Sequence, residues 1–427
     1  MPKLHKYNRQ QLIDNNFVNE PLKARPICTY HSFILNKLSI WISYQLNQVI
    51  KLAKKKVLTV ENQTIDITPS KIIVNNTDTI IKDIEKLKTN SDDIIISLDV
   101  VSLYPNINSD EGIECINKFL HAFNDNQLNT IEINLIIKGL RLILNNSYCK
   151  FNDTIYKQKH GSTMGCPCIP SYANIFSYYQ LLHIITNLMK TNHTIKLLGI
   201  YIDDYIIITT IPTLILETHT YLNNYYDALM KRLTKSLTIQ FTWETSKHSL
   251  HYLDINIYND VKYIHYYVSL YVKPLNNHML LSNKSYHTPS VFKGIIIGHF
   301  IRLIKRNSHY EDFINHLNEF QLHLAVRQYN LTITKLTNLI QSKWNNFNYN
   351  NYNTIRDTLL TKSLEEKDET QFVNVILTNY GKNFNKLIHQ QLQGQLCKSI
   401  EESINHKIRL INKNCHNIGE IFIRASS

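Results

Sequence analysis

The segment YIDDYIII, residues 201–208, places two adjacent carboxylates, Asp203 and Asp204, within a run of apolar and aromatic residues. The neighbouring sequences, LLGI at 197–200 and III at 206–208, have the composition of strands in a buried sheet. Aspartate is common in tight turns, and an isolated Asp-Asp pair usually sits in one. Unpaired carboxylates beside a sheet core are costly, however, so a partner that neutralises them is the alternative interpretation.

A second acidic position, Asp99, ends the β-branched run Ile94–Leu98 and precedes a predicted turn at Tyr104–Ile107. If this strand lies beside the one that leads to Asp203 in an antiparallel sheet, the two carboxylates meet at one edge. Two carboxylates that meet at one edge repel each other, so they need a multivalent cation. Oxygen ligands without His or Cys favour Mg²⁺, with Mn²⁺ as a substitute. Two such ions can activate a 3′-hydroxyl and stabilise a leaving pyrophosphate. The alternative is that Asp99 is only a helix cap and Asp203 only a turn residue.

The composition limits the class of protein and of partner. The 427 residues suffice for two or three domains, and an apolar content of 43% is ordinary for a globular protein. A net charge of +12 favours a polyanionic partner such as nucleic acid, although an acidic membrane surface or simple solubility fits the same charge. No apolar run reaches the roughly 18 residues of a membrane span, and the Lys-rich N-terminus is unlike a signal peptide. The seven cysteines form no CxxC pair, so we expect reduced thiols in an intracellular protein.

Periodicity divides the chain into a mixed basic front, a β-rich middle that holds the acidic turns, and a helical back. The pattern predicts a strand, a turn and a strand at 200–208, and a helix that begins near Ser109. The further predicted elements are helices at Leu135–Asn145, Ser171–Lys190 and Leu214–Lys235, a hairpin at Tyr148–Tyr156, strands between Thr238 and Tyr271, and mostly helical structure from Ser290 to about Leu392.

Three blocks of sequence resemble polymerase motifs A, B and C of reverse transcriptases. They are DVVSLYPNI at 99–107, QKHGSTMGCP at 158–167 with PSYANIF at 170–176, and YIDD at 201–204. More narrowly, the chain resembles the reverse transcriptases of Penelope-like elements. The narrower resemblance also uses RPI at 25–27, FTWE at 241–244, YLD at 252–254, LYVKP at 270–274, HTP at 287–289, and the stretch from Gly294 to Arg306.

This resemblance implies an α+β fold of the right-hand polymerase type, with fingers, a palm built on an antiparallel ferredoxin-like sheet, and a helical thumb. The expected boundaries are fingers at 1–92, palm at 93–280 with an inserted fingers segment at about 110–157, thumb at 281–395, and a C-terminal tail at 396–427. Only 24 residues precede Arg25, and the tail leaves no space for the GIY-YIG endonuclease of many family members. We therefore expect a polymerase core without its own nicking domain and with a shortened or truncated fingers region.

The same resemblance makes the three aspartates catalytic. We expect Asp99 and Asp203 to bridge two Mg²⁺ ions, with the main-chain carbonyl of Val100 as an extra ligand. Asp204 would support the site electrostatically and has a weaker claim as a metal ligand. Tyr104 matches the bulky gate that leaves no room for a ribose 2′-hydroxyl, whereas its alternative role is that of a core tyrosine.

The remaining roles concern nucleotide, primer and template. The residues expected at the nucleotide are Lys23, Arg25, Tyr104, Gln158 and Gly161, and those expected at primer or template are Tyr201, Tyr271, Lys273, Lys293, Arg302, Lys305 and Arg306. The last three follow i, i+3, i+4 spacing, which puts three cations on one helical face suited to the phosphates of an RNA–DNA hybrid. An ordinary solvated face is the alternative. Lys247 is a weaker candidate for the general acid that protonates pyrophosphate.

The second block departs from the family pattern in two ways. Thr163 stands where the family usually has Ala, and Cys166 and Cys168 are unusual there, which bears on the width of the nucleotide pocket. A CxC pair without further ligands is more often a packing feature than a metal site, and we expect packing.

The expected function is therefore that of an RNA-directed DNA polymerase. Its partners would be an RNA template, a DNA primer and dNTPs, and the family resemblance implies residence in the nucleus. Two alternatives belong to other classes. One is an inactive protein that keeps the fold to bind nucleic acid, against which the intact aspartates argue. The other is an RNA-dependent RNA polymerase, which Tyr104 and a Tyr-Ile-Asp-Asp turn in place of Gly-Asp-Asp disfavour.

Overall fold

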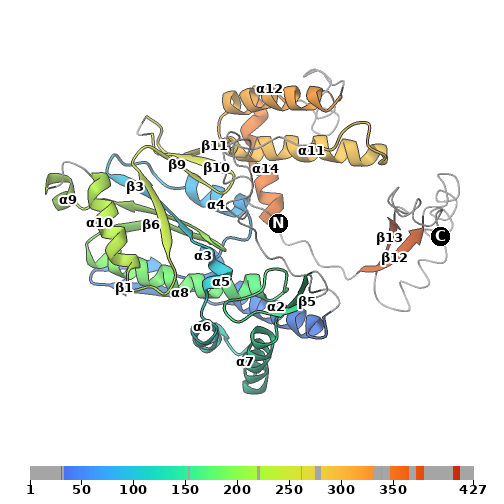
Figure 1. The fold of residues 1–427 in the computed structure, drawn as a ribbon. Coiled ribbons are helices and arrows are strands. Elements are labelled where there is room, and N and C mark those ends of the chain that lie inside the picture. The colour runs from blue at the N-terminus through green and yellow to red at the C-terminus, as the bar shows by residue number, and fades with distance from the viewer. Residues whose placement is uncertain are drawn as a thin grey trace, which may run out of the picture. The chain divides into compact units, whose positions relative to one another are not determined.

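Four antiparallel strands in the order β6-β7-β3-β8 form the sheet that carries the aspartates (Figure 1). They are β3 (Asp93–Val100), β6 (Thr194–Tyr201), β7 (Asp204–Thr210) and β8 (Phe241–Ser246). β6 and β7 are joined by two residues only, which makes the hairpin that the apolar runs predict. The prediction that β3 and the hairpin are neighbours in one antiparallel sheet is confirmed.

The computed structural model describes residues 30, 33–151, 154–218, 222–260, 262–274, 280–329, 338, 347–364, 372–378 and 407–413. The chain divides into two compact units, Met1–Leu364 and Glu365–Ser427. The division falls inside the range expected for the thumb, 281–395.

The two faces of the sheet pack against different elements, because successive side chains of a strand point to opposite faces. Ile94 and Ile96 of β3 belong to a core shared with helix α8 (Ile169–Lys190). Ile95, which points to the other face, belongs to a second core that includes apolar residues of helix α4 (Thr77–Glu85). Both faces of the central strands are thus covered, which explains why the sequences of β3 and β7 are almost continuously apolar rather than alternating.

A smaller antiparallel sheet, in the order β11-β10-β9, contributes to the second core. Its strands are β9 (Ser249–Tyr252), β10 (Ile255–Tyr258) and β11 (Tyr267–Leu270), within the range predicted to hold strands. A two-residue connection, Leu253 and Asp254, joins β9 to β10. Leu253 has a φ of 54°, in the left-handed region.

Helices and two hairpins build the front of the chain and the segment inserted after β3. Helix α6 begins at Ser109 as predicted, because Asn108 accepts hydrogen bonds from the first-turn amides of Asp110 and Glu111. Asn129 and Glu132 form a capping box at the start of α7. The elements are α2 (Asn36–Leu52), β1 (Val57–Val60), β2 (Gln63–Asp66), α3 (Pro69–Ile72), α5 (Leu103–Asn106), α6 (Ser109–Phe123), α7 (Thr130–Asn145), β4 (Tyr148–Phe151) and β5 (Thr154–Lys157). Two further helices, α9 (Thr213–Thr218) and α10 (Leu222–Thr234), lie between β7 and β8.

The back of the first unit is helical, as the sequence predicts. In the described residues it contains α11 (Pro289–Arg306), α12 (Tyr310–Val326), the short 3₁₀ helix η2 (Tyr349–Asn351) and α14 (Tyr352–Leu364). These helices share a third core rich in aromatic residues, including Phe300, Phe313 and Phe320.

The second unit contains a parallel pair of strands, β12 (Phe372–Thr378) and β13 (Lys407–Lys413). The helical expectation for residues 281–395 is therefore wrong for Phe372–Thr378. This segment, FVNVILT, is rich in β-branched residues, which lose side-chain freedom in a helix and favour strands.

None of the helices in the described part of the chain is both long enough and apolar enough to cross a bilayer.

Candidate active site

The carboxylates meet where β3 ends and the β6–β7 hairpin turns. Asp99 is the register partner of Asp204 across β3 and β7, and Tyr201 of β6 is the partner of Asp204 on its other side. Asp203 lies in the two-residue turn, and its carbonyl oxygen accepts a hydrogen bond of 3.0 Å from the Val100 amide. The structure thus brings the three predicted aspartates to one edge of the sheet.

Helix α8 holds the turn between β6 and β7 in a conformation that is unfavourable for the isoleucine in that turn. Ile202 has a φ of 58°, and a β-branched residue in the left-handed region is strained by about 1–3 kcal/mol. The Ile202 amide donates to Asn174 Oδ1 at 3.1 Å, and Ser177 Oγ donates to the Ile202 carbonyl at 3.0 Å. Both of these groups come from α8, which therefore fixes the path of the chain next to Asp203.

The charges of the site act on each other. Burial raises the pKa of Asp204 to about 6, the charges of Asp203 and Asp99 add to the rise, and Lys273 opposes it. The tyrosine predicted as a gate is part of the same environment: burial raises the pKa of Tyr104 to about 12, with Asp203 and Tyr201 contributing. Asp99 is exposed and Asp203 and Asp204 are partly buried, so repulsion among carboxylates at this edge marks a solvent-accessible place where a cation would be favourable.

The donor atoms suit a hard cation, although the side chains do not form a finished coordination shell. Among the residues that the structure describes, no group of three or more His, Cys, Asp or Glu side chains is arranged to hold a metal ion. The carboxylates at the edge are oxygen donors, and burial together with the charges of Asp203 and Asp99 raises the pKa of Asp204. By donor type and charge, the residues present therefore fit Mg²⁺ or Mn²⁺.

Gly161, the first glycine of the second block, is required by close packing on the short helix α5 that follows β3. Gly161 has a φ of 72°, and a Cβ there would collide with the main chain of Pro105. The next residue, Ser162, donates from its amide to the Tyr104 carbonyl at 2.7 Å. Tyr104 and Gly161, both predicted to contact the nucleotide, therefore lie in two segments that pack against each other.

Gln158 belongs to the same loop. Its side-chain nitrogen Nε2 donates to the His160 carbonyl at 2.8 Å, and its side-chain oxygen Oε1 accepts from Thr163 Oγ1 at 2.6 Å. Thr163, which replaces the usual Ala, is thus used to hold Gln158. Lys23 and Arg25, the other two predicted nucleotide residues, lie outside the described residues.

The two cysteines of this block are packed in the interior. Their sulfur atoms are 3.8 Å apart, and Ser39 Oγ lies 3.1 Å from Cys166 Sγ and accepts from the Cys168 amide at 3.0 Å. Both side chains are buried. This arrangement supports the packing interpretation, since they tie the loop to helix α2.

Beside the acidic edge lies a cavity of about 640 Å³ between the small sheet and helices α11 and α12. Three residues predicted to contact primer or template line it, namely Tyr271, Lys273 and Arg302. The Tyr271 ring stacks on His251 with centroids 4.5 Å apart. The histidines His299, His316 and His323 also line the cavity, and sequence reasoning assigned them no role.

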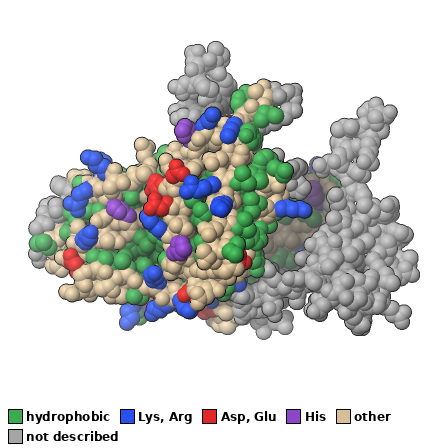
Figure 2. Space-filling model, turned by 90° about the horizontal axis from the view of Figure 1, so that it is seen from below, with side chains coloured by type: hydrophobic (Ala, Val, Ile, Leu, Met, Phe, Trp, Pro, Cys, Tyr) green, Lys and Arg blue, Asp and Glu red, His purple; other side chains and the backbone are tan. Residues whose placement is uncertain are grey.

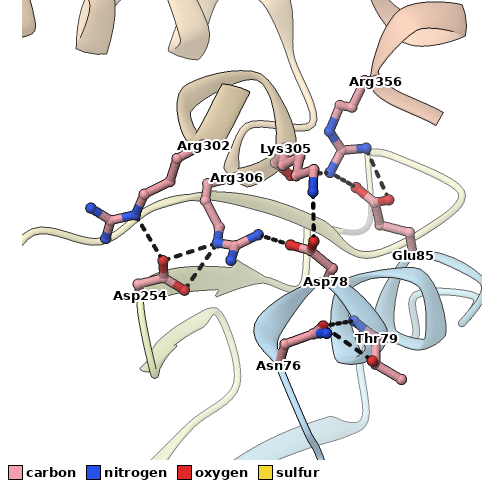
Figure 3. A network of polar contacts seen from close by, with 9 residues as sticks. All are labelled: Asn76, Asp78, Thr79, Glu85, Asp254, Arg302, Lys305, Arg306 and Arg356. Atoms are coloured by element: carbon pink, nitrogen blue, oxygen red, sulfur yellow. Dashed lines mark hydrogen bonds and ion pairs between the residues drawn. The ribbon is translucent and has the colours of Figure 1, made fainter. Parts of the chain in front are cut away.

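Two of the predicted phosphate-binding cations have a different environment from the one expected. Lys305 and Arg306 are ion-paired with Asp78, and their side chains are only 15% and 11% exposed. The i, i+3, i+4 face of α11 exists, but it packs against the protein (Figure 3). We correct the expectation of a solvent-facing cationic stripe for these two residues. Lys293, near the start of α11, is exposed.

Lys247 is not brought to the acidic edge. β8 runs antiparallel to β3, with Thr242 opposite Asp99 and Ser246 opposite Ile95. Lys247 therefore follows the far end of the pairing, about 16 Å along the strand from the position of Asp99 at 3.3 Å per residue. We correct its assignment as the general acid.

Sequence reasoning missed the residues that hold the site in place. Asn174 and Ser177 are polar positions of α8, and their i, i+3 spacing was an available signal for a shared task. Asp254 belongs to the block YLD at 252–254 that the resemblance uses, but it was given no role, and Asp78 had no signal because its partners are remote in sequence. On the face drawn in Figure 2, acidic side chains gather beside Lys and Arg side chains, so the charges of opposite sign lie in adjacent patches.

Comparison with known proteins finds no match to a family model and none to a curated protein. Solved structures do match. Telomerase from Candida albicans, solved with a TWJ fragment of telomeric RNA, has a TM-score of 0.46 and 10% identity over 80% of this chain and 53% of that chain. The corresponding complex from Candida tropicalis has a TM-score of 0.39 and 14% identity over 80% and 56% of the two chains. The RNA-dependent RNA polymerase of a human picobirnavirus has a TM-score of 0.41 and 12% identity over 67% and 52%. The chain is thus distantly similar to polymerases of two kinds, and it spans about half of the length of each.

Proposed function

We propose that the protein is an RNA-directed DNA polymerase that extends a primer 3′-hydroxyl with dNTPs, of the Penelope-like kind that its sequence resembles. One observation carries the proposal: Asp99 and Asp204 are paired across β3 and β7, with Asp203 in the adjoining turn. A chance turn pair and an unrelated helix cap would have no reason to meet at one edge.

The proposed cofactor is a pair of Mg²⁺ ions, for which Mn²⁺ can substitute. Asp99 and Asp203 would hold them, with the main-chain carbonyl of Val100, while Asp204 adds negative charge nearby. Bound ions supply activation of the 3′-hydroxyl and neutralisation of the leaving pyrophosphate.

The rest of the proposed task falls to the chain itself, because phosphoryl transfer depends mainly on positioning. The charge of Asp203 acts on Tyr104, whose ring would exclude a ribose 2′-hydroxyl. The loop of Gln158 and Gly161 packs on Tyr104 and would border the incoming nucleotide. Tyr271, Lys273 and Arg302 line the adjacent cavity and would contact the primer–template duplex.

The test is a primer-extension assay with purified protein, primed poly(rA), Mg²⁺ or Mn²⁺, and dTTP or UTP as the nucleotide. We expect incorporation of dTTP that Asp203→Asn abolishes. The matched control is Asp110→Asn, because the Asp110 side chain is 89% exposed on α6 and belongs to no part of the proposed site. This variant should extend the primer as the wild type does.

The other outcomes assign other functions. Preferential use of UTP would indicate an RNA polymerase. Binding of the primed template without any synthesis, under conditions where both variants are folded, would indicate a nucleic-acid-binding protein. Either result would overturn the proposed activity.

A further inference from the structure

The C-terminal half of helix α11 is attached to two acidic residues that come from different parts of the chain. Arg302 Nε donates to Asp254 at 3.0 Å, and Arg306 Nε donates to both oxygens of the same carboxylate, each at 3.0 Å. Arg306 also pairs with Asp78 through its terminal nitrogen, and Lys305 Nζ donates to Asp78 at 2.7 Å. Figure 3 shows Arg306 between the two carboxylates.

Most side chains of this network are shielded from water, so the network favours one position of helix α11 over others. The side chains of Asp78 and Asp254 are 10% and 25% exposed, and that of Arg306 is 11% exposed. A buried pair adds little net stability, but removing one partner strands the other charge at a cost of about 3–5 kcal/mol. Only an arrangement of α11 that satisfies all these charges together is therefore favourable.

Asp254 differs from Asp78 because its own backbone reaches the proposed active site. Its carbonyl accepts a hydrogen bond of 3.0 Å from the amide of Tyr271, which lines the cavity. Two residues earlier, Tyr252 donates from its hydroxyl to the Asp204 carbonyl at 3.4 Å. The β9–β10 turn is thus bonded to α11 through a side chain and to the acidic edge through its neighbours.

The charge state of Asp254 suits this role. Burial acts to raise its pKa, but Arg306, a hydrogen bond with Thr77 and Arg302 outweigh burial and lower it below the usual range. The carboxylate is therefore ionised at neutral pH, and it binds Arg302 through Nε only. Figure 3 shows the outer nitrogens of Arg302 pointing away from Asp254. Arg302 is 42% exposed and lines the cavity together with Lys273.

We propose that Asp254 is a positioning residue that holds α11, through Arg302 and Arg306, at the distance where Arg302 and Lys273 together bind a nucleic-acid phosphate beside the acidic edge. The inference rests on the proposed function for the identity of the ligand. It adds that duplex affinity depends on a carboxylate that would itself repel a phosphate.

The competing explanation is that Asp254 only stabilises the fold, and the chain offers a matched control for that role. Glu85 and Arg356 form a similar pair, at 2.8 and 3.0 Å, between α4 and α14. Their side chains are 23% and 5% exposed, close to the burial of Asp254 and Arg306. Neither residue lines the cavity.

The experiment compares Asp254→Asn with Glu85→Gln in the full chain. The readouts are the Kd for a labelled RNA–DNA hybrid without nucleotide, the KM for the hybrid and kcat for a single addition, and the free energy of unfolding. We expect both variants to lose stability, and only Asp254→Asn to raise Kd and KM by about tenfold or more with kcat changed less than about twofold. Equal affinity in the two variants would overturn the proposal.

A second variant covers the case in which Asp254→Asn does not fold. Arg302→Gln leaves the Arg306 bridge intact and removes a half-exposed cation, so it should weaken hybrid binding with a smaller loss of stability than Asp254→Asn causes. Unchanged binding in Arg302→Gln would also overturn the proposal.

The binding readout separates this inference from the proposed polymerase activity. Hybrid binding that depends on Asp254 in a protein without any synthesis would support the inference and refute the activity. Synthesis with normal hybrid affinity in Asp254→Asn would support the activity and refute the inference.

Discussion

Asp99 and Asp204 face each other as register partners across β3 and β7, so two carboxylates from distant parts of the chain share one edge of a buried sheet. Such an arrangement destabilises the protein unless a cation joins it. The proposed catalytic edge is therefore a place where stability and function are opposed.

Neutralising Asp204 is expected to stabilise the protein in the absence of metal. A carboxyl whose pKa is raised to about 6 in the folded state opposes folding once the pH exceeds its unfolded value of 3.8, and fully so above about 6. At pH 7.5 with EDTA, Asp204→Asn should therefore raise the free energy of unfolding, by on the order of 1–3 kcal/mol. The gain should shrink toward pH 4.

Denaturant unfolding at several pH values checks this, and added Mg²⁺ supplies the control. Mg²⁺ should stabilise the wild type more than Asp204→Asn. A variant that is less stable than the wild type at pH 7.5 would contradict the repulsion on which the site is argued.

Two glycine substitutions should change stability in opposite directions. Gly161→Ala puts a Cβ against the Pro105 main chain at a φ of 72°, and we expect a loss of about 1–3 kcal/mol and weaker nucleotide binding. Gly298 lies within α11, and no other group lies within 4 Å of the position that a Cβ would take there, so Gly298→Ala should gain up to about 1 kcal/mol. Thermal unfolding of both variants measures the contrast, and a neutral Gly161→Ala would refute the close approach.

Removing the ring of Tyr104 should relax the discrimination between sugars. Tyr104→Ala is expected to lower the preference for dTTP over UTP by at least about tenfold in kcat/KM, because steric exclusion requires the ring. Tyr104→Phe keeps the ring and should keep the preference. If both variants select dTTP equally well, Tyr104 is only a core tyrosine.

Acid should destabilise the protein through His193. Burial lowers the pKa of this fully buried imidazole to about 4, although two backbone contacts oppose the shift. Its nitrogens lie 2.9 Å from Tyr226 Oη and 2.9 Å from Thr191 Oγ1. Because the folded pKa is below the unfolded value of 6.5, the stabilising contribution is complete above pH 6.5 and is lost as the pH falls toward 4.

The expected loss is about 3 kcal/mol between pH 7.5 and pH 4. Comparison of unfolding curves for the wild type and His193→Gln measures it, since the variant should lack this part of the pH dependence. Identical pH profiles would exclude His193 as the cause.

The parts of the fold that the sequence could predict are those set by local patterns. The β-branched run before Asp99 and the hairpin around Asp203 follow from composition and period, and α6 begins where Asn108 can cap it. The meeting of the carboxylates also followed, once the strands were assumed to be neighbours.

Other predictions failed because they depended on contacts remote in sequence. The spacing of Arg302, Lys305 and Arg306 establishes that they share a helical face, but it carries no information on what covers that face. Asp78, which covers it, is 227 residues away from Lys305. Lys247 was misplaced for a related reason, since the direction of β8 beside β3 sets which end of the strand it follows.

The support that α8 gives to the acidic turn has a consequence for how the proposed enzyme can be lost. Asn174 and Ser177 carry no charge and would touch neither nucleotide nor ion, yet they hold Ile202 in its left-handed conformation. A genetic screen for dead variants should accordingly return neutral substitutions in the middle of an inconspicuous helix. Such variants would be classified as folding defects, although their direct effect would be to free the Ile202 backbone from its left-handed conformation.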